Sequence, residues 1–139
     1  MFISYSHGDE DIVDSLTARL EGDNINYWRD EKDLLIGDVI ERAVSKGIQQ
    51  ARLFLIVLTP TSIESRWVRR ELDEAAFEEA EGRKVILPVL AKDLRPTKIP
   101  DRLRRFRYVD IGPSFERGYI QLIASIRAHL RRQLQSQAR

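Results

Sequence analysis

The residue pair best suited to chemistry in this sequence is Trp67 and Glu71, in the segment Ser65–Leu72. In a helix, residues four apart lie on the same face, so an indole ring and a carboxylate would stand side by side. A ring can stack on a planar ligand, and a carboxylate can stabilise a positive charge that develops during a reaction. The plainer interpretation is a surface glutamate that pairs with a cation such as Arg70 or Lys84, with the tryptophan as packing. The spacing alone leaves both interpretations open.

The neighbouring elements place this pair just after a buried strand. The expected strand at 52–58 contains the most hydrophobic run of the chain, Leu53–Leu58, which is typical of a parallel strand covered by helices on both faces. Thr61 and Glu64 fit a capping box, so a helix is expected from there to about residue 81, with Gly82 as its stop. The side of this helix expected to face the core consists of Val68, Leu72, Ala75 and Glu79. Glu71 then lies at the border between core and solvent.

The other patterns alternate between strands and helices. Strands are expected at 2–5, 25–28, 85–90 and 106–111, and helices at 9–21, 38–48 and 119–130. We therefore predict an α/β fold, a flavodoxin-like three-layer sandwich with a five-stranded parallel sheet of order 2-1-3-4-5. Pro88 lacks a backbone donor, so its strand is expected near an edge or at an irregularity. Ligands of such sheets bind beyond the carboxyl ends of the first and third strands, here near Tyr5, Ser6 and His7 and near 59–71.

Composition excludes several classes of function. The chain has 139 residues, a formal net charge of +1, no cysteine and two histidines. These values predict one domain with no disulfide, no metal site, no nucleic-acid partner and no membrane segment, in a cytoplasmic setting. The phosphate-binding patterns G-x-x-x-x-G-K-[ST] and G-x-G-x-x-G are absent, so neither an ATPase nor a Rossmann dehydrogenase is supported. Residues 135–139 read as a polar tail or as the start of a linker to a further domain.

Four segments, in order along nearly the whole chain, resemble the sequence boxes of TIR domains. They are Phe2–Ser6, Asp30 with Gly37, Leu55–Thr59 and Ser65–Leu72. The resemblance identifies 1–134 as a TIR domain and implies a flavodoxin-like fold with a site for NAD. It also implies that Glu71 is the catalytic residue, as in the NAD-cleaving, bacterial-type branch. By the same resemblance, the loop from Asp30 to Gly37 borders the site and mediates contacts between TIR domains.

One carboxylate is chemically sufficient for this reaction. Nicotinamide leaves the cationic NAD+ as a neutral molecule, so no general acid is needed, in contrast to ordinary glycoside hydrolysis. The carboxylate has to stabilise an oxocarbenium-like ribose and position its hydroxyls. Trp67, Tyr5 and Trp28 are the candidates for stacking on a base, and the resemblance places Ser6 and His7 beside the nucleotide.

The loop after the expected second strand departs from the pattern of some NAD-cleaving relatives. Those relatives carry an acid two residues before the loop glycine, where this chain has Leu35. The resulting apolar tip, Leu34, Leu35 and Ile36, is better suited to docking on a neighbouring molecule than to binding a dinucleotide. We therefore expect an oligomerisation loop here, with ordinary loop packing as the alternative.

The sequence thus predicts an NAD+ glycohydrolase that cleaves the nicotinamide–ribose bond and is activated by self-association with other TIR domains. The product would be ADP-ribose or a cyclic ADP-ribose, and NAD+ would be the substrate, with no separate cofactor. The resemblance suggests immune or stress signalling, including antiviral defence, as the setting, with host interference by a pathogen as the alternative, and a sensor domain in the parent protein. The alternative is a non-catalytic TIR–TIR interaction module.

Overall fold

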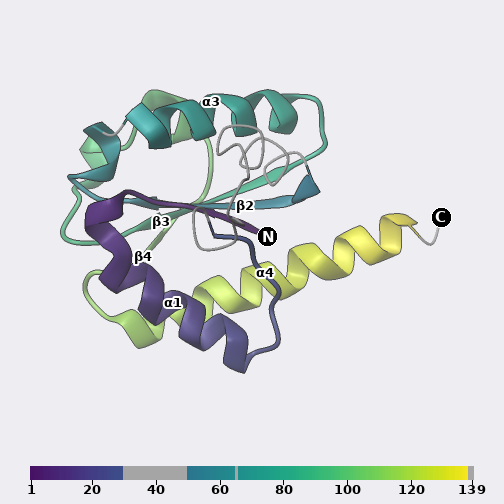
Figure 1. Cartoon of the computed structure of the whole chain (residues 1–139). Coiled ribbons are helices and arrows are strands. Elements are labelled where there is room, and N and C mark those ends of the chain that lie inside the picture. Colours follow the sequence, from purple (N-terminus) through teal and green to yellow (C-terminus); the bar gives the residue numbers. More distant parts are fainter. Residues whose placement is uncertain (30–49, 65, 138–139) are drawn as a thin grey trace, which may run out of the picture.

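A parallel sheet forms the middle layer of the computed structural model, which describes residues 1–29, 50–64 and 66–137 (Figure 1). The side chains of residues 66–71 lie outside that description. Four strands run in the order β1-β2-β3-β4, all parallel. Their bounds are β1 Phe2–Ser4, β2 Leu53–Leu58, β3 Val85–Leu90 and β4 Val109–Asp110.

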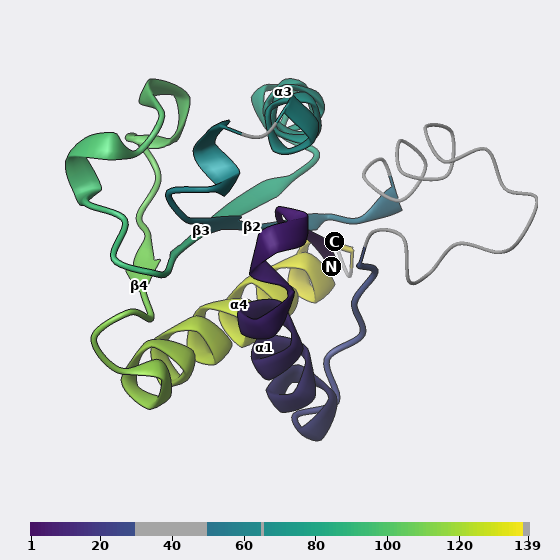
Figure 2. The ribbon, with the colours of Figure 1, turned by 60° about the vertical axis from the view of Figure 1, so that its left-hand side comes forward.

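Helices cover both faces of this sheet, as Figure 2 shows. One face carries α1 (Glu10–Gly22) and α4 (Phe115–Gln137), and the other carries α3 (Arg66–Ala80). The short 3-10 helices are η1 (His7–Asp9), η3 (Ser62–Glu64), η4 (Pro96–Lys98) and η5 (Asp101–Leu103). This is the predicted three-layer α/β architecture. In the described part of the chain, no helix is long and apolar enough to cross a membrane.

The central strand β2 divides its side chains between two cores. Leu53, Leu55 and Val57 pack with α1 and α4, and the alternate residues Phe54, Ile56 and Leu58 pack with α3. All six are buried, as expected for a parallel strand covered on both faces. Each such side chain contributes about 1.5–3 kcal/mol when it leaves water, so β2 anchors both layers.

The prediction of a five-stranded sheet is wrong for the described residues, because 25–28 forms only an isolated bridge. Trp28 pairs with Phe2 in parallel, on the side of β1 opposite β2, where the second strand was expected. The Ile3 amide donates to the Trp28 carbonyl at 2.9 Å. Just before this bridge, the Ile25 amide donates to the Leu20 carbonyl at 2.9 Å. The start of the segment 25–28 is thus bound to the end of α1, and the segment pairs with β1 only at its last residue, Trp28.

The expected strand at 106–111 is also shorter than predicted, which explains why β3 tolerates a proline at position 88. The strand β3 lies next to the edge strand β4, which agrees with the expectation of a position near an edge or at an irregularity. The amides of Val85 and Ala91 donate toward β2, and backbone direction alternates along a strand, so position 88 faces the β4 side. Because β4 pairs only with Val89 and Leu90, no ladder donor is needed at Pro88.

The ends of the helices agree in part with the patterns. Gly82, at φ 74°, follows α3 as predicted, and its amide donates to the Glu79 carbonyl at 2.8 Å. Leu72 and Ala75, on the side expected to face the core, are buried. The last helix continues through Gln137, so residues 135–137 are helical and exposed. The helix expected at 38–48 lies outside the described residues.

Candidate functional site

The β1–α1 turn and the β2–α3 connection meet at the carboxyl edge of the sheet. The turn comprises Ser6 and η1, and the Asp9 amide donates to the Ser6 carbonyl at 2.9 Å. Thr59, which follows β2, donates its hydroxyl to Asp9 Oδ2 at 2.5 Å. Both side chains are buried. This bond brings together residues 50 positions apart and closes the edge where parallel sheets of this type bind ligands.

Thr59 and Ser62 shape the start of the β2–α3 connection. The Ser62 amide donates to Thr59 Oγ1 at 3.0 Å, and the Thr59 amide donates to Ser62 Oγ at 2.8 Å. Each hydroxyl therefore satisfies a backbone donor that the following turn leaves unpaired. The sequence pattern placed a capping box at Thr61 and Glu64, whereas in the structure η3 comes first and α3 begins only at Arg66.

The predicted catalytic pair lies in the helix that follows this connection. Trp67 and Glu71 belong to the first two turns of α3, with side chains outside the described part of the chain. Five further predicted residues lie in the undescribed segment 30–49. They are Asp30, Leu34, Leu35, Ile36 and Gly37. Of the predicted residues after β1, Ser6 is nearly buried and His7 is exposed.

The two other aromatic candidates are occupied by packing. Tyr5 is buried in the core beneath α1, with the Arg29 guanidinium 5.0 Å from its ring centroid. Trp28 is half-buried and stacks on Phe2 at a centroid distance of 5.0 Å. The structure therefore does not support Tyr5 as a stacking surface for a ligand, because its ring lies inside the core.

A buried cation, whose place in the core the sequence did not indicate, packs against α1 and Tyr5. Arg29 is 4% exposed and donates to Asp14 Oδ1 at 2.6 Å, to Thr17 Oγ1 at 3.3 Å and to the Tyr5 hydroxyl at 3.4 Å. Burial opposes the charge, but the bonds to Asp14 and Tyr5 raise the pKa of Arg29 above its ordinary value. A single arginine after an expected strand carries no motif, so its spatial partners gave no signal in the sequence.

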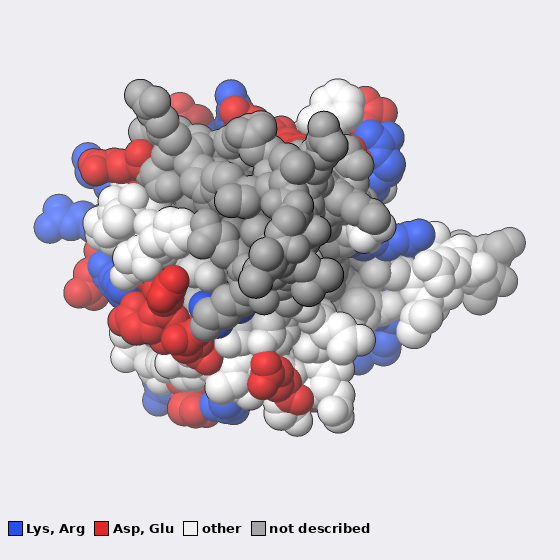
Figure 3. Space-filling view, in the orientation of Figure 1, with Lys and Arg blue, Asp and Glu red and all other residues white. Residues whose placement is uncertain are grey.

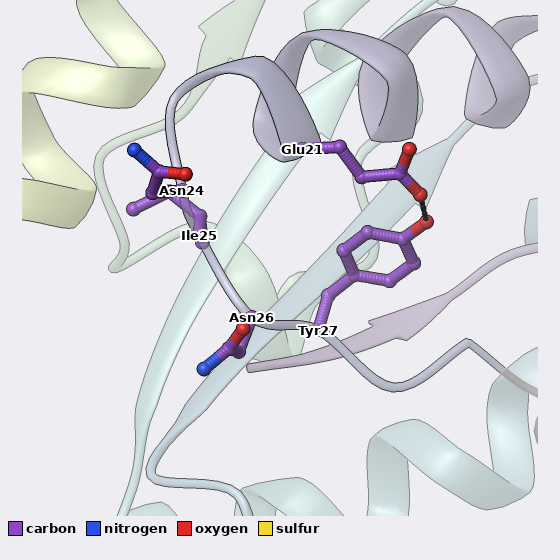
Figure 4. Close-up of a pocket in the computed structure, with 5 residues that line it drawn as sticks. All are labelled: Glu21, Asn24, Ile25, Asn26 and Tyr27. Atoms are coloured by element: carbon purple, nitrogen blue, oxygen red, sulfur yellow. Dashed lines mark hydrogen bonds between the residues drawn. The ribbon is translucent and has the colours of Figure 1, made fainter.

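Two hollows are formed by described residues, and the first is lined in part by Ile63 of the β2–α3 connection. A hollow of about 410 Å³ between α3 and η5 has Leu72 and Ile63 among its lining residues, with the ion pair of Asp73 and Arg102. The other, about 610 Å³, is lined by Glu21, Asn24, Ile25, Asn26 and Tyr27 (Figure 4). In this second hollow the Tyr27 hydroxyl donates to Glu21, and the chain terminus at Met1 contacts the Asn26 carbonyl. It therefore lies at the amino edge of the sheet, opposite the predicted site.

Among the described residues no cluster of histidine and acidic side chains could hold a metal ion.

Comparisons with known proteins point to one family. A family model described as "TIR domain" matches residues 1–123. The chain is 36% identical over 90 residues to the NAD(+) hydrolase TcpA of a Theionarchaea archaeon, an alignment that covers 64% of this chain and 27% of that protein. It is 33% identical over 92 residues to the 2' cyclic ADP-D-ribose synthase BtTIR of Bacteroides thetaiotaomicron, covering 66% and 32%. The chain thus spans about a third or less of these relatives.

The fold agrees with that match. The TIR domain of the Toll-related receptor TRR-2 from Hydra magnipapillata superposes with a TM-score of 0.72 at 20% identity, covering 91% of this chain and 96% of that one. At this identity the likeness concerns the fold alone.

Proposed function

The chain belongs to the TIR domain family, and from that premise we propose that it cleaves the nicotinamide–ribose bond of NAD+. The observation that carries the proposal is the position of Trp67 and Glu71 in α3, which follows the β2–α3 connection at the carboxyl edge of the sheet. Relatives named as an NAD(+) hydrolase and a 2' cyclic ADP-D-ribose synthase support the same bond as the target. NAD+ is the substrate, and the reaction needs no separate cofactor.

In this proposal Glu71 acts by charge and position. Nicotinamide departs as a neutral molecule, so the positive charge moves to the ribose and a nearby carboxylate lowers the energy of that state. Trp67 stacks on one of the rings, and Ser6 and His7 border the nucleotide from the β1–α1 turn. Attack by water gives ADP-ribose, nicotinamide and a proton. Attack by a group of the same substrate molecule gives a cyclic product.

Self-association is the proposed means of activation. The apolar tip formed by Leu34, Leu35 and Ile36 would dock on a neighbouring TIR domain and bring Asp30 and Gly37 to the site. The alternative is that the chain is a non-catalytic TIR–TIR interaction module, in which the same tip docks and Glu71 has no reaction to serve. The proposed setting is immune or stress signalling.

The test is release of nicotinamide from NAD+ by concentrated protein. We expect Glu71→Ala to lower release at least ~100-fold, the scale found when one charge-stabilising group is removed from an active site. Glu81→Ala is the matched control, because Glu81 is an exposed glutamate just beyond α3. In the same assay, the specific activity should decrease as the protein is diluted. Equal release from the wild type and Glu71→Ala would refute the proposal.

A further inference from the structure

Two consecutive residues with left-handed backbone follow β3. Lys92 has φ 53° and Asp93 has φ 60°, a region that residues other than glycine rarely adopt. Such conformations persist only where surrounding contacts enforce them, and they cluster at functional sites. They stand here at the carboxyl edge of the sheet, where the side chain of Lys92 contacts the β1–α1 turn.

The ammonium group of Lys92 reaches across to the β1–α1 turn. It donates to the Gly8 carbonyl at 3.2 Å and to Asp11 Oδ1 at 2.8 Å, and it lies 3.0 Å from Asp9 Oδ1. The contacts with Gly8 and Asp11 are hydrogen bonds, and the contact with Asp9 is an ion pair. The bond to Asp11 helps to raise the pKa of Lys92 and to lower the pKa of Asp11, as expected of a formed ion pair.

All three partners of the ammonium group come from a single short stretch of the chain, Gly8–Asp11. Figure 3 shows acidic side chains gathered over α1, the helix that begins there. Asp9 is held from both sides, because its other carboxylate oxygen accepts the hydroxyl of Thr59. The β1–α1 turn is therefore tied to the end of β2 by Thr59 and to the end of β3 by Lys92.

We propose that Lys92 is a positioning residue that holds the β1–α1 turn, Ser6–Asp9, in the conformation that receives the substrate. This inference rests on the proposed function, in which Ser6 and His7 of that turn border the nucleotide. In this proposal Lys92 acts through the turn and not as a ligand of the pyrophosphate, because its ammonium group already contacts Gly8, Asp9 and Asp11. Its loss releases the turn, so it weakens substrate binding and leaves the bond-breaking step intact.

The experiment compares Lys92→Met with Lys98→Met, which removes an exposed lysine from the same loop after β3. Two quantities are measured. One is amide hydrogen exchange in a peptide that spans residues 2–13, and the other is the pair of constants kcat and KM for nicotinamide release from NAD+. Lys92→Arg retains the charge and the donors, so it serves as the conservative variant.

We expect Lys92→Met to speed exchange in residues 6–9 at least about tenfold and to raise KM about tenfold, with kcat within about twofold of the wild type. Lys92→Arg should recover most of both effects, and Lys98→Met should show neither. Unchanged exchange in Lys92→Met would refute the hold on the turn. Faster exchange with unchanged KM would refute its role in substrate binding. If the wild type releases no nicotinamide, the proposed function fails and the role in substrate binding falls with it, while the exchange measurement alone decides whether Lys92 holds the turn.

Discussion

Two cations hold α1 at two different places, and only one of them lies at the edge of the sheet. Arg29 reaches Asp14 and Thr17 in the helix and Tyr5 at the end of β1, with its side chain 5% exposed. Lys92 reaches the turn that precedes the helix and its first residues, with its side chain 34% exposed. Each cation connects α1 to another strand or loop, yet one is enclosed by the core and the other meets solvent.

The difference in burial implies a division of roles. A charge enclosed by protein has lost its water, so removing it leaves its partners unpaired in a poorly solvated place, at a large cost in stability. A cation in contact with water costs little when lost, because water replaces it as a partner. The Arg29 cluster should therefore stabilise the domain, and the Lys92 cluster should mainly fix local geometry.

The largest expected effect is on the Arg29 side. Arg29→Met should lower the free energy of unfolding by about 2 kcal/mol, because it leaves the buried hydroxyls of Tyr5 and Thr17 without their donor. Urea unfolding followed by circular dichroism measures this. The matched variant Arg102→Met removes an exposed guanidinium paired with exposed Asp73, and it should change stability by less than about 0.5 kcal/mol. Equal losses in the two variants would remove the distinction between a buried and an exposed cation.

An effect of similar size is expected at Thr59, which links the turn to the core. Thr59→Val keeps the shape but removes the hydroxyl that donates to Asp9 and accepts from Ser62. Two buried polar groups then lose a partner, so we expect a loss of about 2 kcal/mol in the same unfolding assay. Thr59→Ser keeps the hydroxyl and should lose less than about 1 kcal/mol. If serine destabilises as much as valine, the methyl group and not the hydrogen bonds holds this position.

The smallest effect is expected at the exposed end of the Lys92 cluster. The hydrogen bond from Lys92 lowers the pKa of Asp11, so the folded state favours the charged carboxylate. The stabilisation of the folded state by this interaction is present above the ordinary aspartate pKa of about 4, and it is lost as pH falls through the lowered pKa of Asp11. Asp11→Asn should therefore melt slightly below the wild type at pH 7. The two melting temperatures should converge at acid pH, as measured by differential scanning calorimetry. A gap that widens on acidification would contradict this sign.

Much of the fold could be predicted because its signals are local. The run Leu53–Leu58 predicted a fully buried strand, and Gly82 predicted the end of α3; the structure confirms both. The isolated bridge at Trp28 and the short pairing of β4 beside Pro88 could not be predicted in this way. Both depend on what pairs beside them, which only the assembled sheet determines.

The candidate site likewise contains features that a local pattern predicts and contacts between distant residues that no local pattern predicts. Glu71 and Trp67 are four residues apart, so their shared helical face could be read from the sequence, and their role remains a proposal. Lys92 lies 81 residues from Asp11 and 84 from Gly8, and no pattern within a single segment reports such a contact. Tyr5 was predicted to stack on a ligand because an aromatic residue at a strand end suits that role, whereas in the structure its ring packs inside the core with the Arg29 guanidinium against it.

The most direct test of the central claim is the amount of nicotinamide released from NAD+ by the wild type and by Glu71→Gln. Glutamine keeps the size of the side chain and removes its charge, so only the electrostatic role is lost. The account predicts release by the wild type that falls at least ~100-fold in Glu71→Gln, with folding unchanged by circular dichroism. Equal release from both proteins, or no release by the wild type at any concentration that it reaches, would contradict the account.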